Sequence, residues 1–218
     1  MAFDAGFLSA IIAEIKTSAV GGRIEKVYQP RADEIVLQMH GREGGKKLLF
    51  RCGASDPRVA FTENMRDNPA VPPSLCMLLR KHLQGAKLAE IRQEGFERVV
   101  TLEFDTRDEM GFPCKKYLIA EIMGKHSNLI LTDENGKILD SIKRVTHEKS
   151  SVREVLPGKE YVFPPSQDKK NPLTATSGDF ALSLHLQEGR KLQEFLYQTY
   201  TGISPIMAGE ICSRAKLD

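Results

Sequence analysis

Short apolar runs, broken at close intervals by turn-forming residues, constrain the fold of this chain more than any other feature. The first block of runs occupies residues 23–29, 34–39, 47–51 and 59–62. The second block occupies residues 87–93, 98–104, 115–122, 128–132 and 137–141. Pro30, Asp33 and a Gly-rich turn at 41–45 divide the first block, and Asn135-Gly136 forms a hairpin turn in the second, because Asn-Gly tolerates positive φ. The pattern predicts a β-meander followed by a second all-β block.

Helical periodicity flanks the first block on both sides. Residues 4–17 place apolar side chains at three- and four-residue spacing, and Asp4 is positioned to cap the first turn. Residues 74–84 predict a helix between the two blocks, with Ser74 as its N-cap and a glycine directly after it as a stop signal.

The C-terminal part of the chain is predicted to be helical. A connector rich in proline, serine and lysine covers residues 157–178, and helical periodicity begins at Asp179. A turn at 202–205 precedes a last helix, in which Pro205 suits the first position. Two or three short helices make a small core on their own, so we expect this region to belong to a larger protein.

Composition excludes several classes of protein. The 218 residues are 41% hydrophobic with a net charge of +2, which is too apolar and too weakly charged for a disordered chain. No apolar run approaches the roughly 18–20 residues of a membrane-spanning helix. No basic leader precedes the first apolar residues, so we expect a cytoplasmic protein that does not associate with membranes. The four cysteines are dispersed without a CxxC pair, which is typical of a reducing compartment.

Familiar enzyme signatures are missing from the sequence. It has no GxxxxGK[ST] phosphate loop, no GxSxG elbow and no HExxH, and its five histidines have no metal-ligand spacing. The segment Gly41-Arg42-Glu43-Gly44-Gly45 lacks the strand–glycine–helix context of a nucleotide-binding loop and fits a hairpin loop better. We therefore expect no catalytic residues, no metal and no cofactor.

One loop carries residue types that suit nucleic-acid binding. It joins two apolar runs and contains Gly124, Lys125, His126, Ser127 and Asn128. Glycine lets a ligand approach the backbone, lysine supplies charge, and serine and asparagine supply neutral hydrogen bonds to phosphate or ribose. An ordinary hairpin turn explains the same residues, and chemistry alone leaves both interpretations open.

Three other polar groups have a structural and a functional interpretation. Glu97 and Arg98 stand at the start of a predicted strand. They form a surface ion pair there, or Arg98 contacts nucleic acid while Glu97 orients its guanidinium. Composition alone favours the ion pair. Arg80-Lys81-His82, near a helix C-terminus, complements the helix dipole or contacts phosphates. The basic segment 143–153 is slightly better explained as a solvated loop.

Several of these segments together resemble one family. Gly21-Gly22-Arg23-Ile24, Tyr28-Gln29-Pro30, residues 73–83 and residues 121–128 occur in the order found in the N-terminal domain of NFACT proteins, which include proteins described as fibronectin-binding protein A. Residues 202–205 and 210–215 resemble the start of the family's helix-hairpin-helix region. The resemblance covers essentially the whole chain. Because family members are much longer, we expect an N-terminal fragment, with an NFACT N-terminal domain at 1–172 and a truncated helix-hairpin-helix region at 173–218.

The resemblance implies both a fold and a function. The fold is α+β, similar to the β-sandwich with flanking helices of the Fpg/Nei DNA glycosylases. The function is a non-catalytic module that binds tRNA and a large ribosomal subunit holding peptidyl-tRNA. In the bacterial member, alanyl-tRNA is recruited and stalled nascent chains receive an alanine tail.

The resemblance also implies the residues that contact RNA. The family's tRNA-contacting Asp-Arg motif matches Glu97 and Arg98; the glutamate keeps the charge but adds a methylene, so we expect Arg98 to be held differently. The loop of Gly124, Lys125, His126, Ser127 and Asn128 is then a second contact, and Arg80-Lys81-His82 supplies phosphate contacts. Because few phosphates are neutralised, we expect weak RNA binding by this chain alone.

Two rival functions follow from the same family. A fibronectin-binding surface adhesin is disfavoured because we find no export signal, anchor or repeat. A DNA glycosylase is disfavoured because those enzymes use an N-terminal proline amine as the nucleophile. This chain begins Met1-Ala2-Phe3-Asp4, which offers no such secondary amine for a Schiff base.

Overall fold

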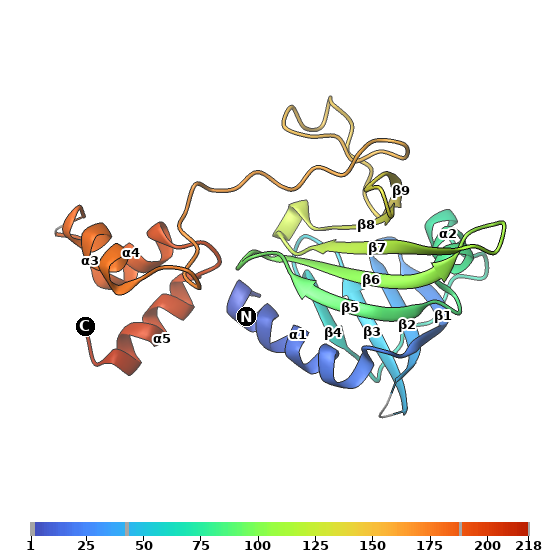
Figure 1. The fold of residues 1–218 in the computed structure, drawn as a ribbon, viewed down its shortest axis with the longest axis horizontal. Coiled ribbons are helices and arrows are strands. Elements are labelled where there is room, and N and C mark those ends of the chain that lie inside the picture. Colours follow the sequence, from blue (N-terminus) through green and yellow to red (C-terminus); the bar gives the residue numbers. More distant parts are fainter. Residues whose placement is uncertain (1–2, 42–43, 188, 218) are drawn as a thin grey trace.

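The computed structural model describes residues 3–41, 44–187 and 189–217 and has an α+β architecture (Figure 1). Its strands form one antiparallel sheet in the order β4-β3-β2-β1-β5-β6-β7-β8-β9. The first four strands are β1 Arg23–Arg31, β2 Glu34–Gly41, β3 Gly44–Arg51 and β4 Arg58–Phe61. The other five are β5 Lys87–Gln93, β6 Val99–Arg107, β7 Pro113–Glu121, β8 Asn128–Asp133 and β9 Ile138–Ser141. Every strand expected from the sequence is confirmed, with ends shifted by a few residues.

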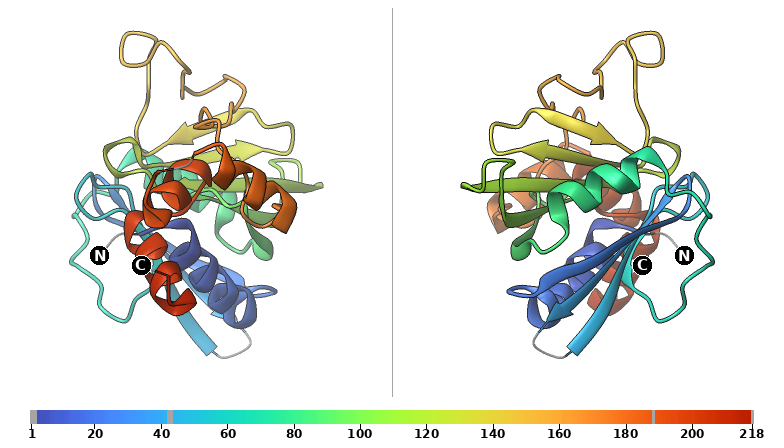
Figure 2. Two further views of the ribbon diagram at one scale, coloured as in Figure 1. Left: turned by 90° about the vertical axis from the view of Figure 1, so that its left-hand side faces the viewer. Right: turned by 90° about the vertical axis from the view of Figure 1, so that its right-hand side faces the viewer.

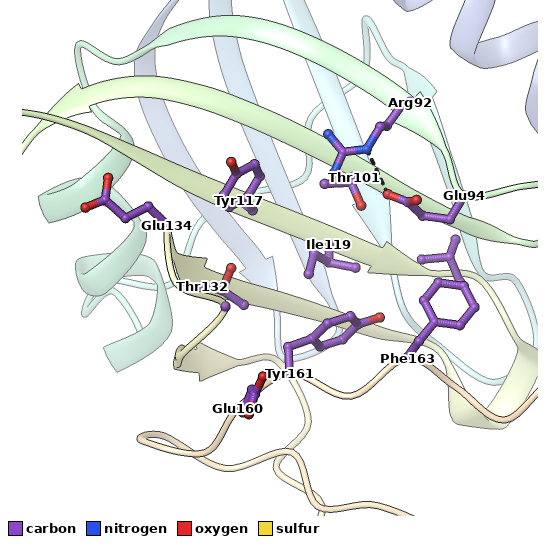
Figure 3. Close-up of a pocket in the computed structure, with 12 residues that line it drawn as sticks. Arg92, Glu94, Thr101, Tyr117, Ile119, Thr132, Glu134, Glu160, Tyr161 and Phe163 are labelled. Atoms are coloured by element: carbon purple, nitrogen blue, oxygen red, sulfur yellow. Dashed lines mark hydrogen bonds and ion pairs between the residues drawn. The ribbon is translucent and has the colours of Figure 1, made fainter.

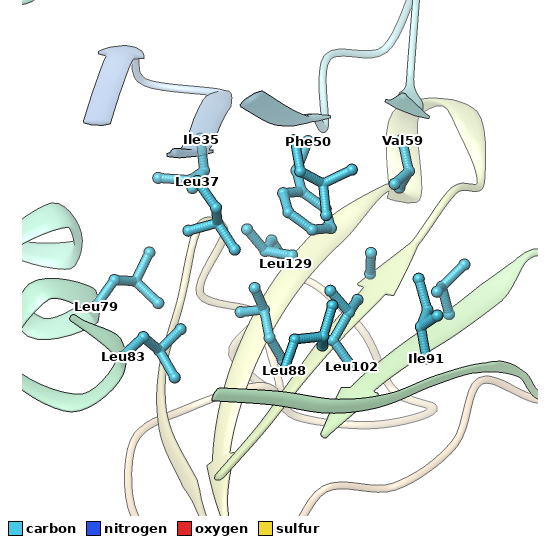
Figure 4. Packing of buried hydrophobic residues seen from close by; sticks show 14 of the residues in the cluster. Ile35, Leu37, Phe50, Val59, Leu79, Leu83, Leu88, Ile91, Leu102 and Leu129 are labelled. Carbon is cyan, nitrogen blue, oxygen red and sulfur yellow. The ribbon is translucent and has the colours of Figure 1, made fainter. Parts of the chain in front are cut away.

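The two predicted β blocks are the two halves of this sheet. They join where β1 pairs with β5 through Arg23 and Lys87, and the sheet folds back so that its halves face each other. Side chains from both halves meet in one core, whose packing is shown in Figure 4 and includes Ile35, Leu37, Phe50, Leu88, Leu102 and Leu129. The alternation of apolar and polar residues therefore buries one face of each half against the other. The likeness to the Fpg/Nei glycosylase fold stays a prediction.

Helix α1 (Ala5–Ala19) covers part of the same core. Leu8, Ile12 and Ile15 are buried in it at the spacing of one helix face. The Asp4 carboxylate accepts the Phe7 amide at 2.9 Å, which confirms the predicted N-cap. Asp4 therefore fixes where the helix begins.

Helix α2 (Ser74–Leu83) packs against β1 at the other end of the domain. The expected N-cap is wrong by one residue, because Ser74 is the first helical residue and Pro73 occupies the cap position without a side-chain hydrogen bond. Pro73 has φ −60° and extended ψ 156°, so the chain enters the helix directly after the proline ring. The predicted stop is confirmed, since Gly85 follows the helix with φ +81°.

The C-terminal helices form a unit with its own small core. They are α3 Ser177–His185, α4 Leu192–Thr199 and α5 Pro205–Ala215. Phe180, Phe195 and Tyr200 pack together, with Phe195 edge-on to both other rings. Pro205 takes the first helical position, as expected. The helix-hairpin-helix identity and the boundary at 172/173 stay predictions.

Hydrogen bonds and close backbone contacts join this helical unit to the sheet domain. The Ser204 hydroxyl donates to Asp4 at 2.6 Å, and the Ala5 amide donates to the Gly202 carbonyl at 3.3 Å. The Thr201 hydroxyl donates to Glu97, and Gly202 lies directly against Phe96. Figure 2 shows the helical unit facing the viewer on the left and α2 facing the viewer on the right, at opposite ends of the molecule.

Candidate nucleic-acid interface

Arg98 directly precedes β6, at the end of the sheet next to the helical unit. Gly95 turns the chain before it with φ +59°, and the Arg98 carbonyl accepts the Ile122 amide at 2.8 Å. These backbone contacts fix the position of the arginine between β5 and the segment after β7.

The Arg98 side chain has no described partner. It is half-buried, and its guanidinium makes no hydrogen bond or ion pair with any residue that the structure describes. It lines two grooves, one of about 340 Å³ toward the helical unit and one of about 330 Å³ beside α1. The first groove is walled by Phe3, Phe163 and Thr201, and the second by Phe3, Phe7 and Pro57. A guanidinium held in such a place keeps all five donors available to a ligand.

Glu97 does not orient its neighbour in this structure. Its Oε1 accepts the Thr201 hydroxyl at 2.5 Å, and no ion pair to Arg98 is formed. The strand-end ion pair favoured on composition is therefore wrong, and so is an arginine held by Glu97. Glu97 instead bonds to the helical unit. Whether either residue contacts tRNA stays a prediction.

The loop after β7 confirms the hairpin and divides its five candidate residues. Gly124 has φ +57° and starts the short 3-10 helix η1 (Gly124–His126). The buried Ser127 hydroxyl accepts the Met123 amide at 2.8 Å, and the buried Asn128 amide donates to the Lys143 carbonyl at 2.8 Å. These two side chains hold the loop. Lys125 and His126 are exposed and leave their side chains free for a ligand.

The basic segment 143–153 is mostly engaged within the fold. Lys143 donates to the Cys52 carbonyl at 2.6 Å, and the Arg144 guanidinium donates two hydrogen bonds of 2.9 Å to the Asp140 carboxylate. Arg153 is bound to the fully buried Glu121. The sequence expectation of a solvated loop is therefore wrong for Arg153, whose charge is taken up by a carboxylate distant in sequence.

The candidates on α2 lie apart from Arg98, at the opposite end of the domain (Figure 2). Arg80 donates through Nε to the Val27 carbonyl at 3.0 Å, and Lys81 forms an exposed pair with Glu109. Burial lowers the pKa of His82, and the neighbouring lysines lower it further. The structure thus places Arg98 beside Ile122 and Met123, which lead into the loop of Lys125 and His126, whereas the α2 residues line neither groove beside Arg98.

A further groove, of about 380 Å³, lies on the outer face of β5–β8 and did not stand out in the sequence (Figure 3). Arg92 donates to Glu94 at 3.0 Å at its rim, and Glu134 and Glu160 add negative charge. An acidic rim repels phosphates, so this groove is a poor candidate for RNA. Its acidic residues Glu94, Glu134 and Glu160 are 40 and 26 positions apart in the sequence, which is why no sequence motif revealed the groove.

Comparisons with known proteins place this chain in a family. A family model described as NFACT N-terminal and middle domains matches residues 4–218. The chain belongs to the NFACT family.

The NFACT relatives include the "Rqc2 homolog RqcH" of Bacillus subtilis, 38% identical over 100% of this chain and 38% of that protein. The human "Ribosome quality control complex subunit NEMF" is 30% identical over 67% of this chain and 13% of that protein. The crystal structure of the N-terminal domain of fibronectin-binding protein PavA from Streptococcus pneumoniae matches with a TM-score of 0.90 at 35% identity, over 99% of this chain and 84% of that one. This NFACT chain thus spans well under half the length of the curated relatives it matches.

Within this NFACT chain, the described residues show two further negative results. None of the described helices is both long and apolar enough to cross a lipid bilayer. The described histidine, cysteine and carboxylate side chains form no cluster of three that could hold a metal ion.

Proposed function

We propose that the chain is the tRNA- and large-subunit-binding module of a ribosome quality control factor in the cytoplasm. The factor recruits alanyl-tRNA to a large subunit obstructed by peptidyl-tRNA and supports alanine tailing of the stalled product. The module itself is not catalytic, and peptide-bond formation is left to the ribosome. Two observations support the proposal: the names of the NFACT relatives and the unpaired guanidinium of Arg98.

The Arg98 guanidinium is the observation that carries the proposal. A half-buried cation without a carboxylate partner loses hydration without compensation, and an anionic or hydrogen-bonding ligand restores it. The planar fork of donors matches phosphate oxygens and the edge of guanine. The loop of Lys125 and His126 follows Ile122, whose amide bonds to the Arg98 carbonyl, so we expect one RNA element to reach all three residues.

The test substitutes Arg98 in the full-length protein. Arg98→Ala removes the fork, and we expect tRNA affinity to fall by at least about fivefold, since a bidentate contact contributes about 1–3 kcal/mol. Alanine tailing of stalled nascent chains falls with it. Arg98→Lys keeps the charge but not the fork, and recovers only part of the loss.

Arg92→Ala is the matched control, because Arg92 lies on the same sheet but is already paired with Glu94. We expect it to tail as wild type does. Normal tailing by Arg98→Ala, with an unchanged fold by circular dichroism, contradicts the proposal.

Fibronectin binding is the second candidate, because the solved relative PavA is named a fibronectin-binding protein. Immobilised fibronectin and labelled tRNA are offered to the same purified chain. Binding to fibronectin that ignores Arg98→Ala, with no binding to tRNA, favours the adhesin.

A further inference from the structure

A separate groove of about 560 Å³ lies at the N-terminal end of α2 and shares no lining residue with the two grooves beside Arg98. We call it the α2 groove. It is formed by the end of β1, the start of α2 and the segment after β9, and its walls include Gln29, Arg31, Ser74, Asp140 and Arg144. Nothing in the Arg98 site uses these residues.

The first observation is a buried oxygen without a donor. Gln29 is only 6% exposed, and its Oε1 has no hydrogen-bond partner among the described residues. Its amide nitrogen is engaged, since Nε2 donates to the Ala32 carbonyl at 3.4 Å. The pairing of β1 with β2 is interrupted between Tyr28 and Arg31, where Pro30 has no N–H to donate. The bulge therefore leaves an acceptor that a ligand hydroxyl would satisfy.

The second observation is the uncapped start of α2. The helix is ten residues long, and no described side chain bonds to its first amides, because the cap position is Pro73. The first three N–H groups of a helix have no partner within the helix, and the helix dipole makes this end attractive to anions. Ser74 and Leu75 of this first turn line the groove.

The charges at the groove complete an anion site. Arg31 is exposed and forms no ion pair with any described residue. Among the described residues that line the groove, Asp140 is the only acidic one. Both oxygens of its carboxylate already accept hydrogen bonds from Arg144, each at 2.9 Å. The uncompensated charge at the rim is therefore the positive charge of Arg31.

We propose that the α2 groove binds one ribose phosphate of RNA. The phosphate lies against the first amides of α2 and Arg31, and the 2′-hydroxyl of the ribose donates to Gln29 Oε1. A phosphodiester carries only acceptors, so the hydroxyl is what satisfies the buried oxygen. The choice of RNA as the source of this ribose phosphate rests on the proposed function. The groove is then a second contact, separate from the two grooves that Arg98 lines.

The experiment uses the 218-residue chain carrying Arg98→Ala, so that binding at Arg98 does not mask the groove. Uniformly ¹⁵N-labelled protein is titrated with A10 RNA, A10 DNA and inorganic phosphate. We expect amide shifts at Ser74 and Leu75 and a shift of the Gln29 side-chain amide, with RNA binding at least about fivefold tighter than DNA. Inorganic phosphate moves the two backbone amides but not the Gln29 side chain.

Two variants separate the two halves of the ligand. Gln29→Met removes the acceptor at nearly constant length, so it abolishes the preference for RNA over DNA while the melting temperature stays the same or rises. Arg31→Gln weakens the binding of both RNA and DNA. It also lowers the slope of log affinity against log salt concentration by about 0.7, as expected for one lost contact to single-stranded phosphate. Lys26→Gln, an exposed cation on the same strand outside the groove, is the matched control.

Equal affinity for RNA and DNA, or a preference for RNA that survives Gln29→Met, overturns the proposal. So does the absence of shifts at Ser74 and Leu75. The Arg98→Ala tailing assay is independent of these readouts, so failure of the α2 groove leaves the proposed function standing. Loss of the proposed function, in turn, leaves the shift experiment interpretable.

Discussion

Arg98 and Arg153 approach the same end of the sheet but are used in opposite ways. Arg153 is 13% exposed and binds Glu121 with both ends of its guanidinium, whereas Arg98 is half-buried without a described partner. Val99 pairs with Glu121 across β6 and β7, so these two side chains share the outer face and Arg98, one residue earlier, faces the other way. Strand alternation therefore keeps Arg98 from the nearest buried carboxylate and leaves it for a ligand.

The Arg153 side of the comparison is a structural network. Arg153 also donates to the Val162 carbonyl at 2.8 Å, and the Tyr161 hydroxyl donates to Glu121 at 2.9 Å. These bonds fasten the segment after β9 to the outer face of the sheet. The difference teaches that a basic segment in the sequence is available for binding only where its cations form no ion pair with a carboxylate of the fold.

The largest effect is expected from Arg153→Ala. It leaves the fully buried Glu121 charge without its main partner, so the free energy of unfolding falls by about 3–5 kcal/mol in urea titrations. Arg214→Ala, which breaks the exposed pair with Glu210, is the control and costs much less. Similar losses of unfolding free energy in the two variants would mean that the buried ion pair of Arg153 contributes no more to stability than an exposed one.

Tyr161→Phe tests the same network more gently. It removes a hydrogen bond to a buried carboxylate, and we expect a loss of about 1.5–3 kcal/mol in urea unfolding at pH 7. Tyr117→Phe, whose hydroxyl bonds no described side chain, should be close to neutral.

The pH dependence of Tyr161 has a defined sign. Burial raises the pKa of its phenol above the ordinary value, and Glu121 raises it further. An unfolded tyrosine ionises near pH 10, so this stabilisation is complete below about pH 10 and is lost as pH rises toward the folded-state pKa. Wild type should therefore lose stability between pH 10 and 11 more steeply than Tyr161→Phe does, and parallel curves would contradict the assignment.

Gly202→Ala sharpens the comparison at the joint beside Arg98. A Cβ at Gly202 would lie 2.1 Å from the Phe96 carbonyl oxygen, at a φ of +73°. We expect a cost of about 1–3 kcal/mol and faster hydrogen exchange at the Ala5 amide as the helical unit loosens. Gly45→Ala meets open space and serves as the control. Unchanged exchange at Ala5 would show that the joint does not depend on this contact.

Arg98→Ala should have the smallest effect on stability. Because the guanidinium has no described partner, the free energy of unfolding changes by no more than about 0.5 kcal/mol, although the affinity for tRNA falls. A loss comparable to that of Arg153→Ala would mean that Arg98 is a structural residue after all.

The sequence predicted much of the fold because its signals are local. Apolar alternation and turn residues such as Gly136 located every strand, and Asp4 located the start of α1. The cap of α2 was misplaced by one residue because Ser74 and Pro73 both suit a helix start. The apolar residues Leu182, Leu184 and Leu186 contribute to the helical pattern after Asp179. Their side chains are nevertheless exposed in the structure, on α3 or directly after it, so the pattern does not mark a buried helix face there.

The candidate site was only partly predictable. Arg98 and the loop of Lys125 and His126 were found from residue type and from the family resemblance. Ser127 and Asn128 look the same in sequence but serve the loop itself, and Gln29 gave no signal of a buried, unsatisfied oxygen. A residue's partners depend on chain segments that local patterns do not describe.

The sequence by itself determined the strands, the helices, the family and the presence of an arginine at position 98. Tertiary structure alone decided which charges are free. The partners that decide it are distant: Glu121 with Arg153, Glu97 with Thr201, and Asp4 with Ser204. Folding brings these pairs together across 32, 104 and 200 positions of the chain. Secondary structure follows from neighbours along the chain, whereas the availability of a cation follows from what the fold places beside it.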